Sequence, residues 1–376
     1  MFKRYYSDKI HSWLKPNKVL VLYGPRQVGK TTIIQNYLKQ YKGKVYQSTG
    51  EDAGLKEILE SNDFSKIISF FTGYDLIFID EAQKIEHIGQ GLKIIVDQIP
   101  KIRVIATGSS SFDLSNKIGE PLVGRQTVHT LFPISVLELK EEKGGAFLYQ
   151  NLERLLIFGQ YPEVLTSKNF ADKIQYLFQI RDAYLYKDIL ELEQIRNSQK
   201  ILQLLRLIAF QIGHEVSLQE LGRQLGMSRN TVERYLDLLE KAFVIIRVGG
   251  FSRNLRKEIT KISRYYFYDN GIRNALIGNF NFLNSRNDIG QLWENFLFIE
   301  RMKKREYLGL YANYYFWRTW SQQEIDLVEE RGGKLYGYEF KWQNHRNHNA
   351  PKEWLSEYQE ASYDIIDQTN YLDFVS

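Results

Sequence analysis

The sequence predicts an α/β fold that begins with a parallel β-sheet covered by helices. Five short apolar runs lie in the first 135 residues, and the segments between them are long enough for helices. This alternation is typical of a parallel sheet with helices on both faces. The chain has 376 residues, more than one compact core usually holds, so we expect further domains. The runs are VLVLY (19–23), KVYQS (44–48), LIFID (76–80), RVIAT (103–107) and TVHTL (127–131).

Changes of pattern along the chain suggest four domains. Pro133 ends the strand-like block, and a helical pattern then continues to about Lys200. Three short helical patterns and alternating strands follow, before the polar connection GNFNFLNSRND and a new helix at 290–305. We therefore expect a sheet domain at 1–136, a helical lid or linker at 137–200, a helix–strand module at 201–280 and a C-terminal α/β module at 281–376.

Composition excludes several classes of protein. The chain is 43% hydrophobic and 25% charged, which is close to the average for globular proteins. No apolar run approaches the roughly 18 residues of a membrane span, and the basic start MFKRYYSDKI has no apolar segment of a secretory signal behind it. The absence of cysteine excludes disulfides and thiolate–zinc sites. We expect a cytoplasmic protein without a membrane partner, and the net charge of +5 permits an anionic partner.

The first apolar run leads into GPRQVGKTT, which matches G-x-x-x-x-G-K-[ST] at 24–31. Its glycines allow the backbone N–H groups to surround phosphate oxygens at the start of the helix that follows. Lys30 would contact the β- and γ-phosphates, and the Thr31 hydroxyl would bind Mg²⁺. We expect ATP and Mg²⁺ as ligands. The residues expected to bind the nucleotide are Gly24, Pro25, Arg26, Gln27, Val28, Gly29, Lys30, Thr31 and Thr32.

The run LIFIDEAQ supplies the acids that a nucleotide-hydrolysing site needs. Asp80, at the end of a buried strand, would bind the water shell of Mg²⁺, together with Thr31. Glu81 would polarise the water that attacks the γ-phosphate. The pair predicts hydrolysis in addition to binding.

Two further positions are candidates with a structural alternative. Thr107 or Ser109, after the fourth run, would face the γ-phosphate if that strand lies between the loop strand and the acid strand; a polar turn would look the same. Arg125, before the fifth run, is placed to act as an arginine finger on the nucleotide of a neighbouring subunit in a homo-oligomer, although surface arginines are common.

The segments GPRQVGKTT, LIFIDEAQ, ATGSSS, GEPLVGR and LFPISVLEL together resemble a prokaryotic AAA+ ATPase family of otherwise unknown function. Its members carry a winged helix and a restriction-endonuclease-like domain after the ATPase. The resemblance covers most of the chain and implies the additional-strand, catalytic-glutamate P-loop fold with sheet order 5-1-4-3-2. The usual G-G-Y-P turn appears as FGQYPEV (158–164), with Gln160 in place of a glycine, which leaves the conformation of the turn open.

The segment VSLQELGRQLGMSRNTVERYLDLLEKAFVI predicts two helices joined by a turn at Gly226, the second capped by Ser228. The following VIIRVGGFSRNLRKEITKISRYYFYD alternates like a wing hairpin, so the pattern is that of a winged helix, in agreement with the resemblance. The buried stripe of the second helix should comprise Val232, Tyr235, Leu236 and Leu239.

DNA is the expected partner of this module. The groove-facing residues would be Arg229, Asn230, Glu233 and Arg234. Six basic residues against one acid between Arg247 and Arg264 suit a phosphate-binding wing. The helix that carries these groove-facing residues also carries Glu233, Asp237 and Glu240, which would repel DNA phosphates. The alternative is that the module docks a protein or serves as a spacer.

Near the C-terminus, Gly332-Gly333 predicts a hairpin turn in EIDLVEERGGKLYGYEFK. This turn places Asp326 opposite Glu339 and Glu324 opposite Lys341, with all four side chains on one face. Opposed carboxylates need a cation between them, either Lys341 or a divalent ion. The other face would carry the apolar set Ile325, Leu327, Tyr338, Phe340 and Trp342.

The hairpin also resembles the PD-(D/E)xK nuclease motif. The resemblance implies Mg²⁺ bound by Asp326 and Glu339, with Lys341 stabilising phosphate charge and Glu294, in the first turn of a helix, as a further acid. The alternative is an exposed charged face with a Glu324–Lys341 ion pair, and a Glu294 favoured by the helix dipole.

We therefore expect an ATP-hydrolysing AAA+ ATPase that couples its nucleotide state to a C-terminal, nuclease-like module acting on DNA. Whether that module cuts DNA stays open. The alternative is a nucleotide-switched binding or signalling protein whose C-terminal domain is catalytically inactive.

Overall fold

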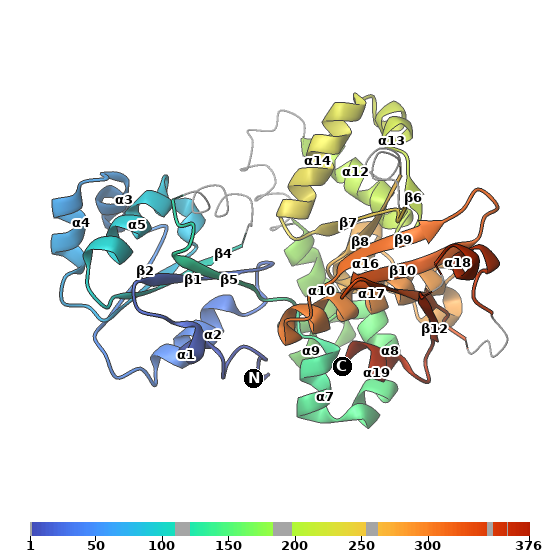
Figure 1. Cartoon of the computed structure of the whole chain (residues 1–376), viewed down its shortest axis with the longest axis horizontal. Coiled ribbons are helices and arrows are strands. Elements are labelled where there is room, and N and C mark those ends of the chain that lie inside the picture. The colour runs from blue at the N-terminus through green and yellow to red at the C-terminus, as the bar shows by residue number, and fades with distance from the viewer. Residues whose placement is uncertain (1, 110–120, 183–197, 253–261, 344–348, 359) are drawn as a thin grey trace. The chain divides into compact units, whose positions relative to one another are not determined.

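The structure is a computed structural model, shown in Figure 1. It describes residues 2–109, 121–182, 198–252, 262–343, 349–358 and 360–376. The chain forms two compact units, Met1–Pro133 with Lys241–Phe243 and Ile134–Glu240 with Val244–Ser376. Among the described helices, none combines the length and apolar composition that crossing a bilayer requires.

The first unit contains a five-stranded parallel sheet in the order β2-β3-β4-β1-β5. Read from its other edge, this is the expected order 5-1-4-3-2, and each strand matches one of the five apolar runs. The strands are β1 (Lys18–Tyr23), β2 (Val45–Thr49), β3 (Leu76–Asp80), β4 (Arg103–Gly108) and β5 (Gln126–Thr130). The central strands β1, β3 and β4 are almost fully buried, because helices cover both faces.

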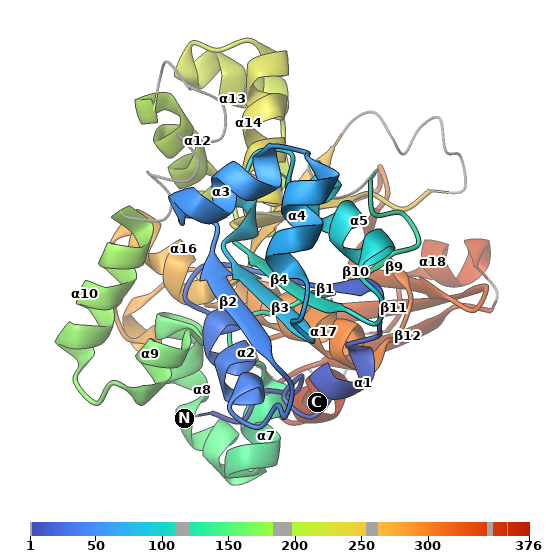
Figure 2. The ribbon, with the colours of Figure 1, turned by 90° about the vertical axis from the view of Figure 1, so that its left-hand side faces the viewer.

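Helices connect these parallel strands. In Figures 1 and 2, α3, α4 and α5 lie on one side of the sheet, and α1 and α2 lie on the other. Asp52 and Asp63 cap α3 and α4, each accepting backbone N–H hydrogen bonds of the first turn. The elements are α1 (Ile10–Trp13), α2 (Lys30–Leu38), α3 (Ala53–Glu60), α4 (Phe64–Phe71), the 3₁₀ turn η1 (Ala82–Lys84) and α5 (Ile88–Gln98).

The second unit begins with helices, as the sequence predicts for residues after 136. Ser135 and Glu138 form a capping box at the start of α7. The expected helical pattern at 137–200 lies partly outside the described residues, because 183–197 are not described. The described helices of this stretch are α7 (Val136–Lys143), α8 (Gly145–Phe158), α9 (Pro162–Thr166) and α10 (Phe170–Ile180).

The FGQYPEV turn follows α8 and settles the question raised by Gln160. Only Gly159 has a left-handed φ there, at 72°, and a Cβ at Gly159 would collide with the Asp269 carboxylate. Gln160 has no positive φ, its N–H donates to Asp269 Oδ2 at 2.7 Å, and its carbonyl accepts from the N–H of Ile134 at 2.9 Å. A glycine at 160 is therefore not required for this turn.

The next segment contains the expected helix–turn–helix and the strands after it. Gly226 has φ 59°, and the Ser228 hydroxyl accepts from the Thr231 N–H at 3.1 Å, as a cap does. The predicted stripe Val232, Tyr235, Leu236 and Leu239 is buried. The elements are α12 (Ser198–Phe210), β6 (Glu215–Val216), α13 (Leu218–Leu225), α14 (Arg229–Lys241), β7 (Ile245–Gly249) and β8 (Ser263–Phe267), with the strands in the order β6-β8-β7.

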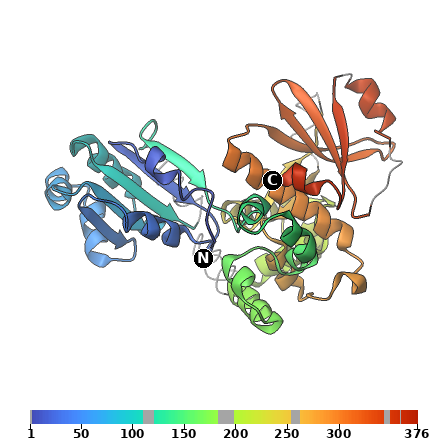
Figure 3. The same cartoon turned by 90° about the horizontal axis from the view of Figure 1, so that it is seen from below.

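The C-terminal part is a four-stranded sheet in the order β12-β11-β10-β9, with the long helix α17 against one face (orange in Figure 3). Gly332 and Gly333, at φ 56° and 76°, form the predicted turn between β10 and β11. The elements are α16 (Asn270–Ile277), η3 (Leu283–Ser285), α17 (Ile289–Leu308), β9 (Asn313–Arg318), β10 (Glu324–Arg331), β11 (Lys334–Phe340), α18 (Lys352–Glu357), β12 (Ser362–Ile366) and α19 (Tyr371–Val375).

The predicted hairpin register is confirmed, since Leu327 pairs with Tyr338, but one side chain was assigned to the wrong face. Tyr338 and Phe340 pack against Phe374, as an apolar face requires. Ile325 instead belongs to a core cluster with Trp317, Val328, Trp354 and Tyr358. The register of β10 against β9 shifts between Ile325 and Val328, and this bulge interrupts the strict alternation of faces.

Candidate functional site

The loop after β1 has the backbone that phosphate binding requires. Gly24 has φ 140°, and a Cβ there would collide with the carbonyl oxygen of Leu131. Gly29, with φ 97°, is the N-cap of α2, and Gln27 also has a positive φ of 59°. The chain therefore curls at the N-terminus of α2, where free N–H groups and the helix dipole favour an anion.

Lys30 lies within this loop. Its side chain is buried, with a residue exposure of 5%, and its Nζ donates to the carbonyl oxygens of Gly24 and Pro25 at 2.8 Å each. These two hydrogen bonds hold the ammonium group against the backbone of the loop. Its charge is thus placed beside the curled backbone, where phosphate oxygens would lie.

Asp80 connects the loop to the neighbouring strands. The Thr31 hydroxyl donates to Asp80 Oδ2 at 2.7 Å, and the Thr107 hydroxyl donates to Asp80 Oδ1. The structure thus brings together three residues that the sequence singled out. Thr107 reaches Asp80 because β4 lies between β1 and β3 in the sheet.

Glu81 has its own polar neighbours. Its φ of 48° is left-handed, and the Gln83 side-chain amide donates to its Oε2. Ser109 Oγ lies 3.3 Å from the same oxygen and accepts from Gln83 Nε2 at 3.1 Å. Ser109, rather than Thr107, therefore contacts Glu81. Sequence reasoning missed Gln83, although it belongs to the quoted LIFIDEAQ.

Arg4 is a second residue that sequence reasoning missed. Its guanidinium is buried and donates to the carbonyl of Val28, in the loop, and to that of Phe132 at 2.6 Å. Arg4 therefore braces the loop from the N-terminal segment. No motif marks an isolated arginine of this kind.

The hairpin acids of the second unit are buried and close together. Asp326 and Glu339 are 8% and 7% exposed. Asp326 Oδ2 accepts from the Phe340 N–H at 2.8 Å, and Glu339 Oε1 accepts from Lys341 Nζ at 2.6 Å. Glu339 Oε2 is buried without a hydrogen-bond partner in the described part of the chain. A buried carboxylate oxygen without a protein donor is a position that a water molecule, a proton or a cation can satisfy.

The cation beside these acids comes from β8, which corrects two expectations. Arg264, assigned to an exposed basic wing, is 4% exposed. Its Nη2 lies 3.0 Å from Glu324, and its Nη1 lies 3.5 Å from both Asp326 and Glu294. The alternative of a Glu324–Lys341 ion pair is wrong, because Glu324 pairs with Arg264 and Lys341 pairs with Glu339. Burial of the guanidinium among acids explains both differences.

Glu294 joins the same cluster, but from a different helical position than expected. α17 begins at Ile289, so Glu294 lies in its second turn, beyond the reach of the helix dipole. Its Oε1 accepts from the Tyr266 hydroxyl at 2.6 Å. We call Glu294, Glu324, Asp326, Glu339, Lys341 and Arg264 the carboxylate cluster.

Acids outnumber cations in the carboxylate cluster. Burial, with the charge of Asp326, raises the pKa of Glu294 to about 8 and that of Glu339 to about 7. Burial also raises the pKa of Asp326. Burial of these acids beside one guanidinium and one ammonium therefore favours their protonation or an added cation.

The donors fit a divalent cation only in part. Asp326 and Glu339 Oε2 are hard oxygen donors of the kind Mg²⁺ prefers. Within the described ranges, however, no three His, Asp or Glu side chains converge as ligands for a metal. A cation here would have two protein ligands, and water or phosphate oxygens would complete its shell.

The outward face of α14 is available as expected, with one change. Arg229, Asn230 and Arg234 are exposed, while Glu233 is half-buried beside Arg247 at 3.8 Å. The remaining basic residues of the expected wing fall within 253–261, outside the described residues.

Comparison with known proteins identifies one of these regions. Residues 16–140 match the family described as an AAA domain. This supports a P-loop AAA-type ATPase domain with a nucleotide-binding function. Residues 149–282 and 289–371 match two families described as domains of unknown function, and neither description names a winged helix or a nuclease.

Similar whole proteins carry no functional name. An uncharacterized protein of Mycobacterium tuberculosis is 28% identical over 327 residues, which cover 86% of this chain and 70% of the relative. An uncharacterized protein of Methanocaldococcus jannaschii is 26% identical over 310 residues, covering 77% and 68%. One of Haemophilus influenzae is 24% identical over 311 residues, covering 76% and 74%.

Arg125 lies away from the phosphate loop of its own AAA domain. It directly precedes β5, at the edge of the sheet where the parallel strands begin, whereas the loop follows the end of β1. Its Nε pairs with Asp97 at 2.5 Å, and its side chain is 41% exposed. A role toward a neighbouring subunit stays a prediction.

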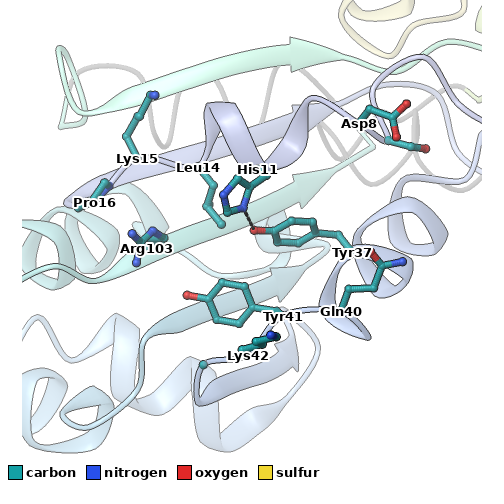
Figure 4. Close-up of a pocket in the computed structure, with 12 residues that line it drawn as sticks. Asp8, His11, Leu14, Lys15, Pro16, Tyr37, Gln40, Tyr41, Lys42 and Arg103 are labelled. Atoms are coloured by element: carbon teal, nitrogen blue, oxygen red, sulfur yellow. Dashed lines mark hydrogen bonds between the residues drawn. The ribbon is translucent and has the colours of Figure 1, made fainter.

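A cavity of about 850 Å³ lies at the same starting edge of the sheet (Figure 4). Pro16 and Gly43 precede β1 and β2, and Arg103 begins β4. A hydrogen bond of 3.2 Å joins His11 Nδ1 and the Tyr37 hydroxyl on its wall. The cavity is therefore not part of the phosphate-loop site.

Proposed function

We propose that the chain is an ATP-hydrolysing AAA+ ATPase whose nucleotide state controls a C-terminal, nuclease-like module. One observation carries the ATPase proposal: Asp80 is held between the hydroxyls of Thr31 and Thr107, with Glu81 directly after it. A nucleotide-binding loop alone would explain Thr31 but not this alignment. In a P-loop site, hydrolysis needs the metal-binding acid and the water-positioning acid at one strand end.

The residues then have distinct roles. Lys30 and the N–H groups of 24–32 would bind the phosphates, and Thr31 and Asp80 would hold the Mg²⁺ that accompanies ATP. Mg²⁺ would neutralise charge that develops on the phosphates. Glu81 would orient the attacking water, and the contacts from Gln83 and Ser109 would fix its carboxylate.

Glu81→Gln tests this proposal, because the amide keeps the size of the side chain but cannot act as a base. We expect ATP binding to persist, measured with a fluorescent ATP analogue, and phosphate release to cease. Glu86→Gln, an exposed position nearby, is the matched control. Normal turnover by Glu81→Gln would show that the catalytic role is misassigned.

Arg125 would complete the site only in a homo-oligomer, as an arginine finger in trans. Mixing Arg125→Ala with the Lys30→Ala variant tests this. Subunits that share sites would regain turnover in the mixture, because one interface would pair an intact loop with an intact finger. Unchanged turnover of Arg125→Ala alone would exclude the finger.

For the second unit we propose a helical lid to about residue 200, a winged helix to about 280 and a restriction-endonuclease-like domain beyond it. The orphaned Oε2 of Glu339 beside Asp326 supports a Mg²⁺ position there. A bound Mg²⁺ would activate water for phosphodiester cleavage. Lys341 would stabilise charge on the phosphate, and Arg229, Asn230 and Arg234 would contact DNA.

Plasmid cleavage with Mg²⁺ or Mn²⁺, with and without ATP, tests the second unit. We expect cleavage that Asp326→Ala and Glu339→Ala abolish and that Asp364→Asn, an exposed acid on β12, leaves intact. Absence of cleavage under every nucleotide condition would favour the alternative, a nucleotide-switched binding protein. The excess of buried acid over buried cation in the carboxylate cluster supports a cation position, which cleavage would require.

A further inference from the structure

We infer that Arg264 is a built-in counter-ion that competes with a divalent cation for the carboxylate cluster, so that β8 controls loading of the metal position. The inference rests on the metal position proposed for Asp326 and Glu339. It assigns to the helix–strand module a regulatory contact with that position.

The geometry of Arg264 places its charge against the acid that the cation would need. The guanidinium spans three carboxylates from two elements, Glu294 of α17 and both Glu324 and Asp326 of β10. Asp326 would also be a metal ligand, so it has two competing cationic partners. A guanidinium cannot lose its charge under ordinary conditions, and like charges at such distances repel strongly.

The surroundings hold the guanidinium in place. Arg264 lies over the Phe316 ring, 4.6 Å from its centroid, and its Nε has no hydrogen-bond partner among the described residues. Tyr266, two residues further along β8, donates to Glu294. Two residues of β8, Arg264 and Tyr266, therefore contact the carboxylate cluster, so the position of the strand sets both contacts.

β8 itself is tied to the C-terminal sheet. It pairs with β7, and the chain after β7 pairs with β9 through the Gly250–Phe316 bridge and the Phe251 N–H, which donates to the Phe316 carbonyl at 2.6 Å. A shift of β7 and β8 would therefore be transmitted to the position of Arg264. Withdrawal of the guanidinium would leave Asp326 and Glu294 without their cation and would favour metal binding.

Mn²⁺ titration of the full chain by calorimetry, without nucleotide, tests the inference. We expect Arg264→Gln to bind Mn²⁺ at least about tenfold more tightly than the unaltered protein, equivalent to about 1.4 kcal/mol. The double variant Asp326→Asn/Glu339→Gln defines binding elsewhere, including the phosphate loop, and is subtracted. Arg264→Lys should bind with intermediate affinity, since an ammonium cannot span three carboxylates, and it carries the test if Arg264→Gln does not fold.

The outcomes separate the two proposals. If the unaltered protein binds Mn²⁺ above the double-variant background, and the Arg264 variants bind equally or more weakly, the counter-ion role is wrong and the metal position stands. If neither the unaltered protein nor the Arg264 variants exceed that background, the metal position itself is wrong, and the inference fails with it.

Discussion

The two units bury charged side chains in different ways. Among the described residues of the first, Arg4 and Lys30 are the buried charged side chains, and both donate to backbone carbonyl oxygens. In the second, acids and bases are buried together, as in the Arg301–Glu329 and Lys303–Glu300 pairs. Contacts to carbonyl oxygens hold the Lys30 ammonium beside the backbone of the phosphate loop, whereas an acid and a base that are buried together reduce each other's charge.

The carboxylate cluster belongs to the second kind, with one difference. It resembles the other buried pairs of the second unit, because Arg264 and Lys341 each contact acids. It differs from them in Glu339 Oε2, a buried carboxylate oxygen without a hydrogen-bond partner among the described residues. An unsatisfied buried acid therefore marks the candidate site in this unit, and burial of charge alone does not.

The largest effect should come from removing the acid of a buried ion-pair group, since Glu329 pairs with Arg301 and also lies 3.8 Å from Arg305 and 3.9 Å from Arg331. Arg301 and Glu329 form a two-point ion pair at 2.8 and 2.9 Å, both buried. Glu329→Leu leaves the guanidinium without its main partner, and we expect a loss of about 3–5 kcal/mol in unfolding free energy by urea titration. The double variant Arg301→Met/Glu329→Leu should recover only part of it, because Arg305 and Arg331 still lose the carboxylate. A loss below about 1 kcal/mol for Glu329→Leu would show that this buried ion pair contributes little to the stability of the second unit.

The next effect concerns Lys30, the buried cation of the phosphate loop. Lys30→Ala should lower ATP turnover by about 10²–10³-fold, because the phosphates lose their buried charge partner, as measured by phosphate release. Lys39→Ala, at the other end of α2, is the matched control. Turnover within about threefold of normal would contradict the assignment of Lys30.

A smaller effect should appear as a pH dependence of the second unit. Burial raises the pKa of Asp269 to about 6 from an ordinary 3.8. A raised carboxyl pKa contributes stability that is present below the ordinary value and lost as pH rises through about 6. Between about pH 4.5 and 7.5 the loss should be about 2 kcal/mol, and Asp269→Asn should remove this component. Equal pH slopes in urea unfolding for the two proteins would show that Asp269 does not titrate in this range.

The smallest effect should come from Thr107, whose hydroxyl donates a hydrogen bond to the Asp80 carboxylate. Thr107→Val keeps the shape of the side chain but leaves one carboxylate oxygen without its donor. We expect turnover to fall about tenfold, with ATP affinity within about twofold. If Thr107→Val lowers turnover as much as Lys30→Ala does, Thr107 acts directly on the phosphate and not only through Asp80.

The first unit was largely predictable because its signals are contiguous. All five strands follow from short apolar runs read in place, and their order follows from the family resemblance. Thr31, Asp80 and Thr107 were each candidates, but the hydrogen bonds that join Thr31 and Thr107 to Asp80 depend on the order of the strands. Arg4 could not be predicted, since its partners Val28 and Phe132 are distant in sequence. The hairpin register also followed from a local signal, the Gly332-Gly333 turn.

The carboxylate cluster shows where prediction from the sequence ended. Asp326 and Glu339 were found through the turn, but the bulge that moved Ile325 to the other face has no local marker. Arg264 was assigned to an exposed wing because charge runs are usually solvated. Its burial depends on β8 packing against α17 and β10, which is a tertiary contact. Long-range pairing of charges is information that neither periodicity nor motif spacing contains.

The brace formed by Arg4 has a practical consequence for anyone preparing the protein. Removing residues 1–4 would deprive the Val28 and Phe132 carbonyls of their Arg4 donor, and a bulky tag fused close to Arg4 would disturb the same contacts. Such a preparation would retain every motif residue, but its phosphate loop would lack this support. Weak nucleotide binding by a shortened sample would then reflect the missing arginine, whereas a cleavable tag on a long spacer would leave Arg4 in place.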